Sequence, residues 1–212
     1  KMDTSTESCS WLSILNSTYV SIQDVSLTDT IVRTPDGKRS VIEVHEISQT
    51  VEIRNFMVKN VNFDGHSDYT ITDSILFLSK ANELIITNIT IDQSVLINTV
   101  VVNLGRISAF GAIDTVSLAS SIINYGAFYC YIGELPDATY NQNNSFTVQN
   151  IVVRNTTIDG EFLYMDMRAE NEIVDPTKSI QLSFRNIIFN NNTINDSNLF
   201  SLSNNQLNFN EF

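Results

Sequence analysis

The sequence contains few of the residues that interrupt secondary structure, add flexibility or form disulfides. Its 212 residues include 7 glycines, 3 prolines and 2 cysteines. So few Gly and Pro residues exclude a flexible linker and a collagen-like chain, and two cysteines exclude a disulfide-dense scaffold. Cys9 and Cys130 could pair with each other or with parts of a longer chain, but we expect Cys130 to be a small buried apolar residue.

Positive charge is also scarce: 12 Lys and Arg stand against 24 Asp and Glu, so the formal net charge is −12. Such a surface argues against binding to nucleic acid or anionic membranes and favours solubility. The longest apolar candidates, such as "INTVVVNL", have the length of a strand, so no membrane insertion is expected within this segment. No signal peptide is visible. The chain begins with Lys1 and ends inside a repeat, so we expect a fragment of a longer protein.

The dominant feature of the sequence is a repeat. Val, Ile, Thr, Phe and Tyr, which favour strands, are abundant. Six stretches align without gaps over thirteen positions, and they read "VSIQDVSLTDTIV", "VEIRNFMVKNVNF", "LIITNITIDQSVL", "VSLASSIINYGAF", "FTVQNIVVRNTTI" and "LSFRNIIFNNNTI". They start at Val20, Val51, Leu84, Val116, Phe146 and Leu182. A seventh start, "LNFNEF" from Leu207, is cut short by the end of the chain.

The columns of this alignment are either apolar or polar. Positions one, three, eight and thirteen are apolar in every copy, and position six is apolar in all but one, Ser121. Position five is a polar column, predicted to form a ladder, of Asp24, Asn55, Asn88, Ser120, Asn150 and Asn186. Position ten contains Asp29, Asn60, Gln93, Tyr125, Asn155 and Asn191.

The column pattern predicts a solenoid. Positions one and three lie on one face of a strand, whereas six and eight have the opposite parity, so the chain must bend at position five for both pairs to point inward. Asn and Asp suit this corner because they tolerate left-handed backbone. A second apolar strand follows each motif after a variable loop. We therefore predict an all-β parallel β-helix of six to seven coils with about three short strands each. It forms one domain, 1–212, with a possible entry or cap segment at 1–18 and the coils at 19–212.

The "hxhxNhxh" coil, in which h is apolar, occurs as "VEIRNFMV", "LIITNITI", "FTVQNIVV" and "LSFRNIIF". With its Asn ladder, it resembles the right-handed parallel β-helix of the pectin-lyase-like superfamily over nearly the whole chain. It is also similar to Asn-rich coils in large surface proteins of ciliates and other protists. The resemblance implies the fold. It leaves function open, because the superfamily includes pectate lyases, polygalacturonases, phage tailspikes and adhesins.

Candidate catalytic and metal-binding residues are few. Polysaccharide-cleaving enzymes of this superfamily would show acids clustered at outward positions of neighbouring coils. The acids here are scattered, so we predict no catalytic residue and no cofactor. In "FDGHSD", Asp64 and Asp68 could hold a cation, although an Asp-Gly turn with solvated neighbours is the simpler interpretation.

Six N-x-S/T sequons are present, and the repeat ranks them as glycosylation sites. Asn16 and Asn143 fall in predicted loops and Asn195 follows an inward residue, so these three are the expected sites. The weaker candidates are Asn88, Asn155 and Asn191, because they belong to the polar columns and an inward-facing column leaves no room for a glycan.

These observations favour a non-enzymatic structural or adhesive β-solenoid glycoprotein, extracellular or on the cell surface and made in the secretory pathway. Unpaired strands at solenoid ends invite self-association into a filament, and glycans are further possible partners. One alternative is a polysaccharide lyase or glycoside hydrolase of pectin-lyase-like fold. Another is a carbohydrate-binding module, in which a sugar-stacking strip would come from Tyr125, Tyr129, Tyr131 and Tyr164; these tyrosines could instead alternate in and out of the strand wall.

Overall fold

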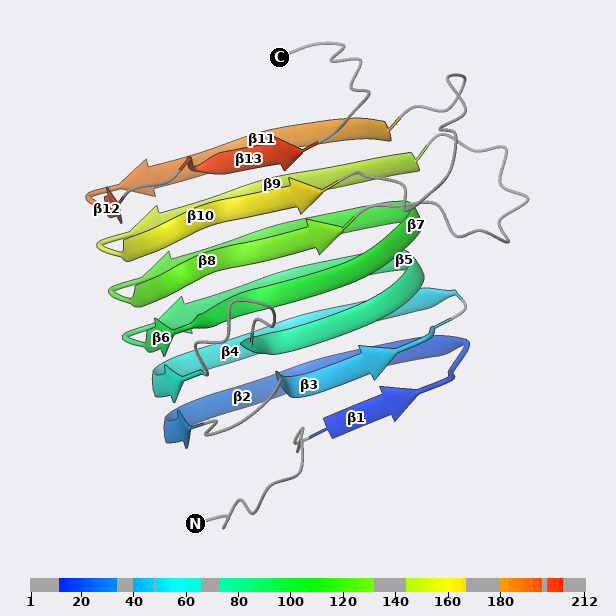
Figure 1. The fold of residues 1–212 in the computed structure, drawn as a ribbon, viewed down its shortest axis with the longest axis horizontal. Coiled ribbons are helices and arrows are strands. Elements are labelled where there is room, and N and C mark those ends of the chain that lie inside the picture. Colours follow the sequence, from blue (N-terminus) through cyan, green and yellow to red (C-terminus); the bar gives the residue numbers. More distant parts are fainter. Residues whose placement is uncertain are drawn as a thin grey trace.

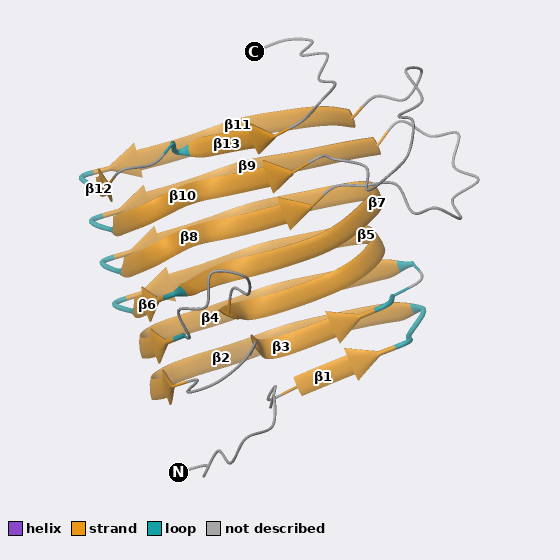
Figure 2. Ribbon diagram, viewed as in Figure 1, coloured by secondary structure: helices purple, strands orange, loops and turns teal. Residues whose placement is uncertain are grey.

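The computed structural model describes residues 12–33, 40–47, 49–65, 73–131, 144–166, 180–195 and 198–203. Strands account for nearly all of this described part (Figure 2). They are β1 (Leu12–Leu15), β2 (Tyr19–Arg33), β3 (Ser40–His45), β4 (Thr50–Asp64), β5 (Asp73–Asp92), β6 (Val95–Ile97), β7 (Thr99–Ala119), β8 (Ile122–Tyr131), β9 (Asn144–Arg154), β10 (Thr157–Asp166), β11 (Ile180–Asn190), β12 (Thr193–Asn195) and β13 (Phe200–Ser203). These ranges contain no helix that is long and apolar enough to span a membrane.

The strands form the rungs of a parallel β-solenoid. Every pairing between them is parallel, and segments far apart in the sequence lie side by side from β1 upward to β11 (Figure 1). One wall stacks β2, β4, β5, β7, β9 and β11. The opposite wall stacks β1, β3, β5, β7, β8, β10 and β13. The predicted all-β parallel solenoid is confirmed.

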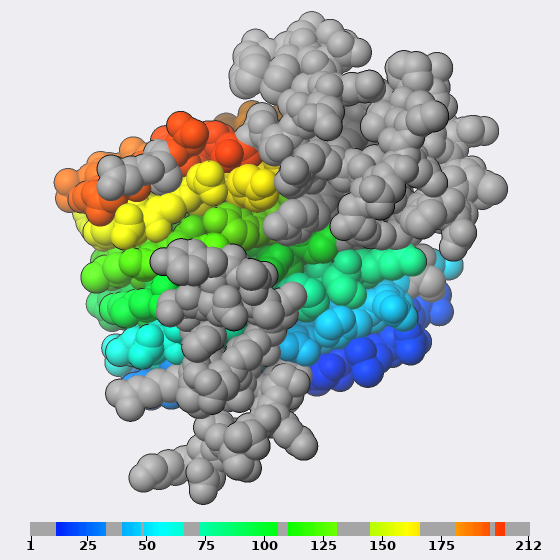
Figure 3. All heavy atoms as spheres, in the orientation of Figure 1, coloured from blue at the N-terminus to red at the C-terminus, as the bar shows by residue number. Residues whose placement is uncertain are grey.

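The number and length of the elements differ from the prediction. The solenoid has about four turns, whereas the sequence count of six to seven coils includes motifs at both ends whose turns are incomplete in the described residues. The strands are longer than expected, and β7 covers 21 residues, because backbone pairing continues through the bends. Figure 3 shows the successive coils as adjacent bands of colour.

The strand register corrects the fourth repeat. Val51 pairs with Val20 and Leu84, as the alignment predicts. However, both Leu84 and Phe146 pair with Gly111 rather than with Val116, so the predicted start at Val116 is wrong by five residues. The fourth motif reads "GAIDTVSLASSII". Its start lies 27 residues after the third (84 to 111) and 35 before the fifth (111 to 146).

Gly111 hides this register because it breaks the apolar pattern at position one. A Cβ atom at Gly111 would overlap the ring of Phe146, which is buried in the next coil. The aromatic ring therefore fills the space that an apolar side chain fills in the other coils. In the corrected register Val116 stands at position six, so Ser121 is no longer an exception there.

Both corner positions have left-handed backbone in all six motifs, with φ between 49° and 57°. Each such residue reverses the parity of the strand, so positions one and three, then six and eight, then eleven and thirteen point inward. Asn and Asp dominate because they adopt this conformation at lower cost than most residues. The twelve corner residues are Asp24, Asn55, Asn88, Thr115, Asn150 and Asn186 at position five, and Asp29, Asn60, Gln93, Ser120, Asn155 and Asn191 at position ten.

The space between the walls is filled by one continuous apolar core. Cys130 belongs to it as a fully buried free cysteine, as the sequence predicts. Burial raises the pKa of its thiol, because the charged thiolate is not solvated there. Cys9 lies outside the described residues.

This burial predicts an unreactive thiol in the native protein. In a Cys9→Ser variant, a disulfide reagent such as DTNB should fail to modify Cys130 in native buffer, since only an exposed thiolate reacts. The same sample should react fully once unfolded in guanidinium chloride. Rapid modification of the folded variant would contradict the burial of Cys130.

Candidate functional site: polar ladders and an outer aromatic column

The position-five side chains form a hydrogen-bonded ladder along the outside of the corner, where they are exposed. The Asn55 Nδ2 donates to Asp24 Oδ1 (2.7 Å), and the Asn88 Nδ2 donates to Asn55 Oδ1 (2.8 Å). Further along, the Asn186 Nδ2 donates to Asn150 Oδ1 (2.9 Å). Asn88 was ranked as a weaker glycosylation site on the condition that its column faces inward. The ladder residues are exposed, so this column faces outward.

Ser120, predicted to belong to this ladder, lies instead in the position-ten column, and Thr115 takes the position-five corner. Asp114, one residue earlier, accepts the amide of Asn150 (2.8 Å) and that of Gln149 (2.8 Å). The Thr115 hydroxyl donates to the same carboxylate (2.9 Å). Asp114 therefore starts a second run of the ladder.

Burial and hydrogen bonding shift the pKa of the Asp114 carboxyl in opposite directions. Partial burial raises the pKa of this carboxyl, but the hydrogen bonds from Gln149, Asn150 and Thr115 together outweigh burial, so the pKa lies below its ordinary value. A depressed folded-state pKa adds stability above the unfolded-state pKa, and this stability is lost as the pH falls through the folded value.

We therefore expect Asp114→Asn to be destabilising at neutral pH, with the difference from the wild-type chain shrinking as the pH falls below about 4, the ordinary range of an Asp carboxyl. The measurement is the free energy of unfolding by urea across a pH series. Asp159→Asn, which removes a carboxylate in another coil, is the control for a general charge effect. A stability difference for Asp114→Asn that stays constant at all pH values would contradict the assignment.

A second ladder runs along position ten. The Asn60 Nδ2 donates to Asp29 Oδ1 (2.7 Å), and the Asn191 Nδ2 donates to Asn155 Oδ1 (2.8 Å). Tyr125, predicted for this column, is displaced from it by Ser120 in the corrected register.

Position eleven carries an internal column of hydroxyl groups that the sequence alignment missed. Ser94, Ser121 and Thr156 are each at most 2% exposed. The Val61 N–H donates to Ser94 Oγ (3.2 Å), and the Ser94 N–H donates to Ser121 Oγ (3.1 Å). Each hydroxyl also donates to the carbonyl two residues earlier, over 2.7–2.9 Å. The column of small polar residues becomes visible in the sequence only when the fourth repeat starts at Gly111.

An outward column on the opposite wall is rich in aromatic side chains. Phe77 pairs with Asn103, Asn103 with Tyr129, and Tyr129 with Tyr164. The rings of Tyr129 and Tyr164 lie 5.2 Å apart between centroids, and Tyr125 meets Tyr129 edge-on at 5.8 Å. The Tyr129 hydroxyl donates to the backbone carbonyl of Tyr125 (3.3 Å). All three tyrosines are half-buried, and the side chain of Tyr131 lies outside the described part.

Backbone geometry beside this column is unusual. Tyr125 has φ 130° and Gly126 has φ 146°, and Gly160, which pairs with Tyr125 in the next coil, has φ 137°. A Cβ at Gly160 would overlap the Tyr125 carbonyl group. Glu161 follows Gly160 in the chain, and its carboxylate accepts a hydrogen bond from the Tyr129 hydroxyl (3.5 Å). The outer column therefore combines ring faces, an amide and a carboxylate.

The other predicted site residues are dispersed. Asp64 is exposed at the end of β4, and Asp68 lies outside the described residues. In the described ranges, no group of three or more His, Cys, Asp or Glu side chains is arranged to hold a metal ion. Of the sequon residues, Asn143 lies outside those ranges, and the rest are exposed: Asn16, Asn88, Asn155, Asn191 and Asn195.

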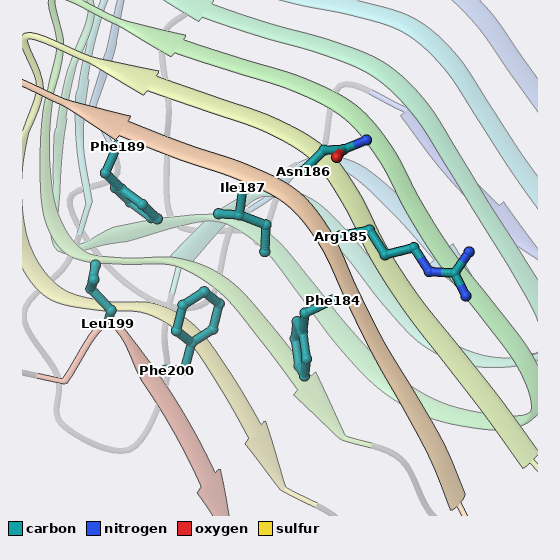
Figure 4. Close-up of a pocket in the computed structure, with 7 residues that line it drawn as sticks. All are labelled: Phe184, Arg185, Asn186, Ile187, Phe189, Leu199 and Phe200. Carbon is teal, nitrogen blue, oxygen red and sulfur yellow. The ribbon is translucent and has the colours of Figure 1, made fainter. Parts of the chain in front are cut away.

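The C-terminal end of the solenoid contains a cavity of about 490 Å³. Phe184, Ile187 and Phe189 of β11 point into it from one wall, and Leu199 and Phe200 face them from the other (Figure 4). Arg185 and Asn186 also line it but point away (Figure 4). The apolar residues here are only partly buried, whereas those of the middle coils are fully buried.

No protein-family model and no curated protein matches the chain.

Proposed function

We propose that the chain is a structural or adhesive β-solenoid displayed on the cell surface as a glycoprotein of the secretory pathway. The observation that supports a structural role is the way in which coils are joined. Neighbouring coils share backbone pairing, two outer side-chain ladders and an internal hydroxyl column. Because each coil contacts only its neighbours, such a stack is a stiff, quasi-one-dimensional element that carries load or presents its walls.

We further propose a right-handed winding and a relationship to the pectin-lyase-like β-helices and the Asn-rich coils of protist surface proteins. The support is the left-handed Asn corner repeated in successive coils. General chirality also favours it, since parallel crossover connections are right-handed in about 98% of cases.

Surface location is tested on cells that produce the full-length protein. Antibody against the solenoid should label intact, unpermeabilised cells, and glycopeptide analysis should find glycan on Asn16, Asn143 or Asn195. Asn88, Asn155 and Asn191 serve as internal controls, because their side-chain amides belong to the ladders and should carry less glycan. Labelling only after permeabilisation, with all three favoured sites unmodified, would reject the assignment.

Carbohydrate binding is the second candidate, and the column of Phe77, Asn103, Tyr129 and Tyr164 favours it. Ring faces with neighbouring amide and carboxylate groups are a common arrangement for stacking on sugars and bonding to their hydroxyls. A Tyr129→Ala, Tyr164→Ala variant should lose retention on polysaccharide columns, whereas Tyr19→Ala, which removes an exposed tyrosine from β2, should not. Incubation with uronic-acid polymers, with and without Ca²⁺, separates binding from cleavage. Equal retention of all variants would exclude this candidate.

A further inference from the structure

Three tyrosine rings meet where β8 and β10 bend from one wall of the solenoid into the next. These two strands lie side by side and continue through the bend without a loop (Figure 1). The rings of Tyr125 and Tyr129 are inclined at 61°, and those of Tyr129 and Tyr164 at 60°. All three are half-buried, so none is enclosed by the core. Rings at such angles are not stacked face to face, and a small group can contact more than one of them.

Tyr125 occupies its place at a cost in backbone energy. Its φ of 130° is unfavourable for a bulky residue. The residue paired with it in the next coil is Gly160, which has φ 137° and adopts this conformation freely. A glycine at position 125 would therefore suit the bend better. Because strained residues cluster at ligand-binding sites, the retained tyrosine points to a role for its side chain beyond the packing of the bend.

The Tyr129 ring is held in place by the backbone beneath it. A Cβ atom at Gly126 would lie 3.3 Å from Cε1 of this ring, so the ring lies over the glycine backbone. The Tyr129 hydroxyl donates to the Tyr125 carbonyl (3.3 Å), and Glu161 Oε2 lies 3.5 Å from the same hydroxyl. The carboxylate is thus fixed beside the three rings.

The charge of this corner is negative. Glu161 is half-buried beside the rings, and the exposed Asp159 lies two residues before it. In the described part of the chain, no Lys or Arg side chain forms an ion pair with either carboxylate, and the whole chain has a formal net charge of −12. The faces of aromatic rings also attract cations. Rings and carboxylate together favour a ligand that is cationic and has an apolar surface.

We propose that Tyr125, Tyr129, Tyr164 and Glu161 form a binding site for a quaternary ammonium group, such as the trimethylammonium group of choline. Its methyl groups contact the rings, and its charge is attracted by the ring faces and by Glu161. A quaternary nitrogen has no N–H to satisfy, so it binds without further acceptors. The group is the same in free choline and in a phosphatidylcholine headgroup. This site goes beyond carbohydrate binding, because a neutral sugar gains nothing from the charge of Glu161.

Calorimetric titration of the full chain with choline chloride tests this site. The matched probe is 3,3-dimethyl-1-butanol, which has the shape of choline without its charge and should bind at least about tenfold more weakly. Tyr129→Leu and Glu161→Gln should each weaken choline binding about tenfold. Tyr19→Leu is the control, because Tyr19 also donates to a glutamate, Glu52 (2.7 Å), but has no ring contact in the described part. No choline binding by the wild type, or equal binding of both probes, would overturn the proposal.

Tyr125→Gly separates binding from folding. Glycine relieves the strained φ, so the midpoint of thermal unfolding should not fall, whereas choline binding should weaken about tenfold. Unchanged choline binding by this variant would show that the Tyr125 ring is not part of a site, against the proposal.

Two further measurements identify the source of the ligand and separate this site from the sugar column. Flotation with phosphatidylcholine vesicles, competed by free choline, shows whether a lipid headgroup is bound; titration with choline alone shows a soluble ligand. Phe77 lies two rungs from Tyr129, so Phe77→Ala should leave choline binding unchanged even if it abolishes retention on polysaccharides. A loss of choline binding in Phe77→Ala as large as that in Tyr129→Leu would contradict the assigned location.

Discussion

Gly111→Val should destabilise the protein by about 1–3 kcal/mol, the usual cost of overpacking a filled core, although it restores the apolar residue that every other copy has at position one. The reason is the ring of Phe146, which occupies the space where the new side chain would lie. Phe146 is 2% exposed, so its ring is enclosed by other side chains and can move aside only if they shift. The measurement is the free energy of unfolding by urea or guanidinium chloride.

A compensating variant makes this result specific to the register. Combining Gly111→Val with Phe146→Val places the residue type of the second repeat in both coils, and it should recover most of the lost stability. If instead Val116 opened the fourth repeat, Gly111 would lie in a loop, and the single substitution would change the stability by less than about 0.5 kcal/mol. A neutral Gly111→Val would therefore argue against the observed pairing of Gly111 with Leu84 and Phe146.

Phe162→Ala should cost about 3–5 kcal/mol, the range for removing a buried aromatic ring. Phe162 is fully buried, and its ring lies 5.5 Å from that of Phe128, 5.2 Å from Phe189 and 6.0 Å from Phe200 between centroids. It thus packs between the fully buried Phe128 and the partly buried Phe189 and Phe200. Loss of the ring would enlarge the cavity there, and a stability of about 5–15 kcal/mol, typical of natural domains, leaves little reserve.

The matched control is Phe110→Ala, which removes the same ring from a side chain that is 38% exposed. Its cost should be clearly smaller, because less apolar area leaves the core. Unfolding monitored by circular dichroism gives both values under one set of conditions. Equal losses for Phe162→Ala and Phe110→Ala would show that the aromatic cluster at the C-terminal end contributes no specific packing.

Much of the fold could be read from the chain because its determinants are local. The parity switch between positions three and six requires a bend at position five, and Asn or Asp at that position marks a left-handed residue. The structure has that conformation at Asp24, Asn55 and Asn88. The predicted start of the fourth repeat was wrong because we required an apolar side chain at position one. At Gly111 a side chain of the next coil, the ring of Phe146, fills that space instead.

The candidate site was harder to predict from the sequence, because it depends on contacts between side chains of neighbouring coils. Sequence analysis singled out Tyr125, Tyr129 and Tyr164 but could not align them, since the contact between Tyr129 and Tyr164 joins residues 35 positions apart (129 to 164). The buried hydroxyls of Ser94, Ser121 and Thr156 were overlooked, because their column appears only in the correct register. Likewise, Asp114 looked like a scattered acid until pairing placed it beside Gln149 and Asn150.

The sequence by itself determined that this chain is a parallel β-solenoid with an apolar interior and left-handed polar corners, because side-chain parity and corner chemistry recur within each repeat. Only the tertiary structure decided that Gly111 opens the fourth motif, that corner amides donate to the preceding coil, and that Ser94, Ser121 and Thr156 form an internal hydroxyl column. These features depend on which side chain of one coil meets which side chain of the next. The stretches between the motifs vary in length and carry no repeating signal of their own, so the sequence alone does not show that register.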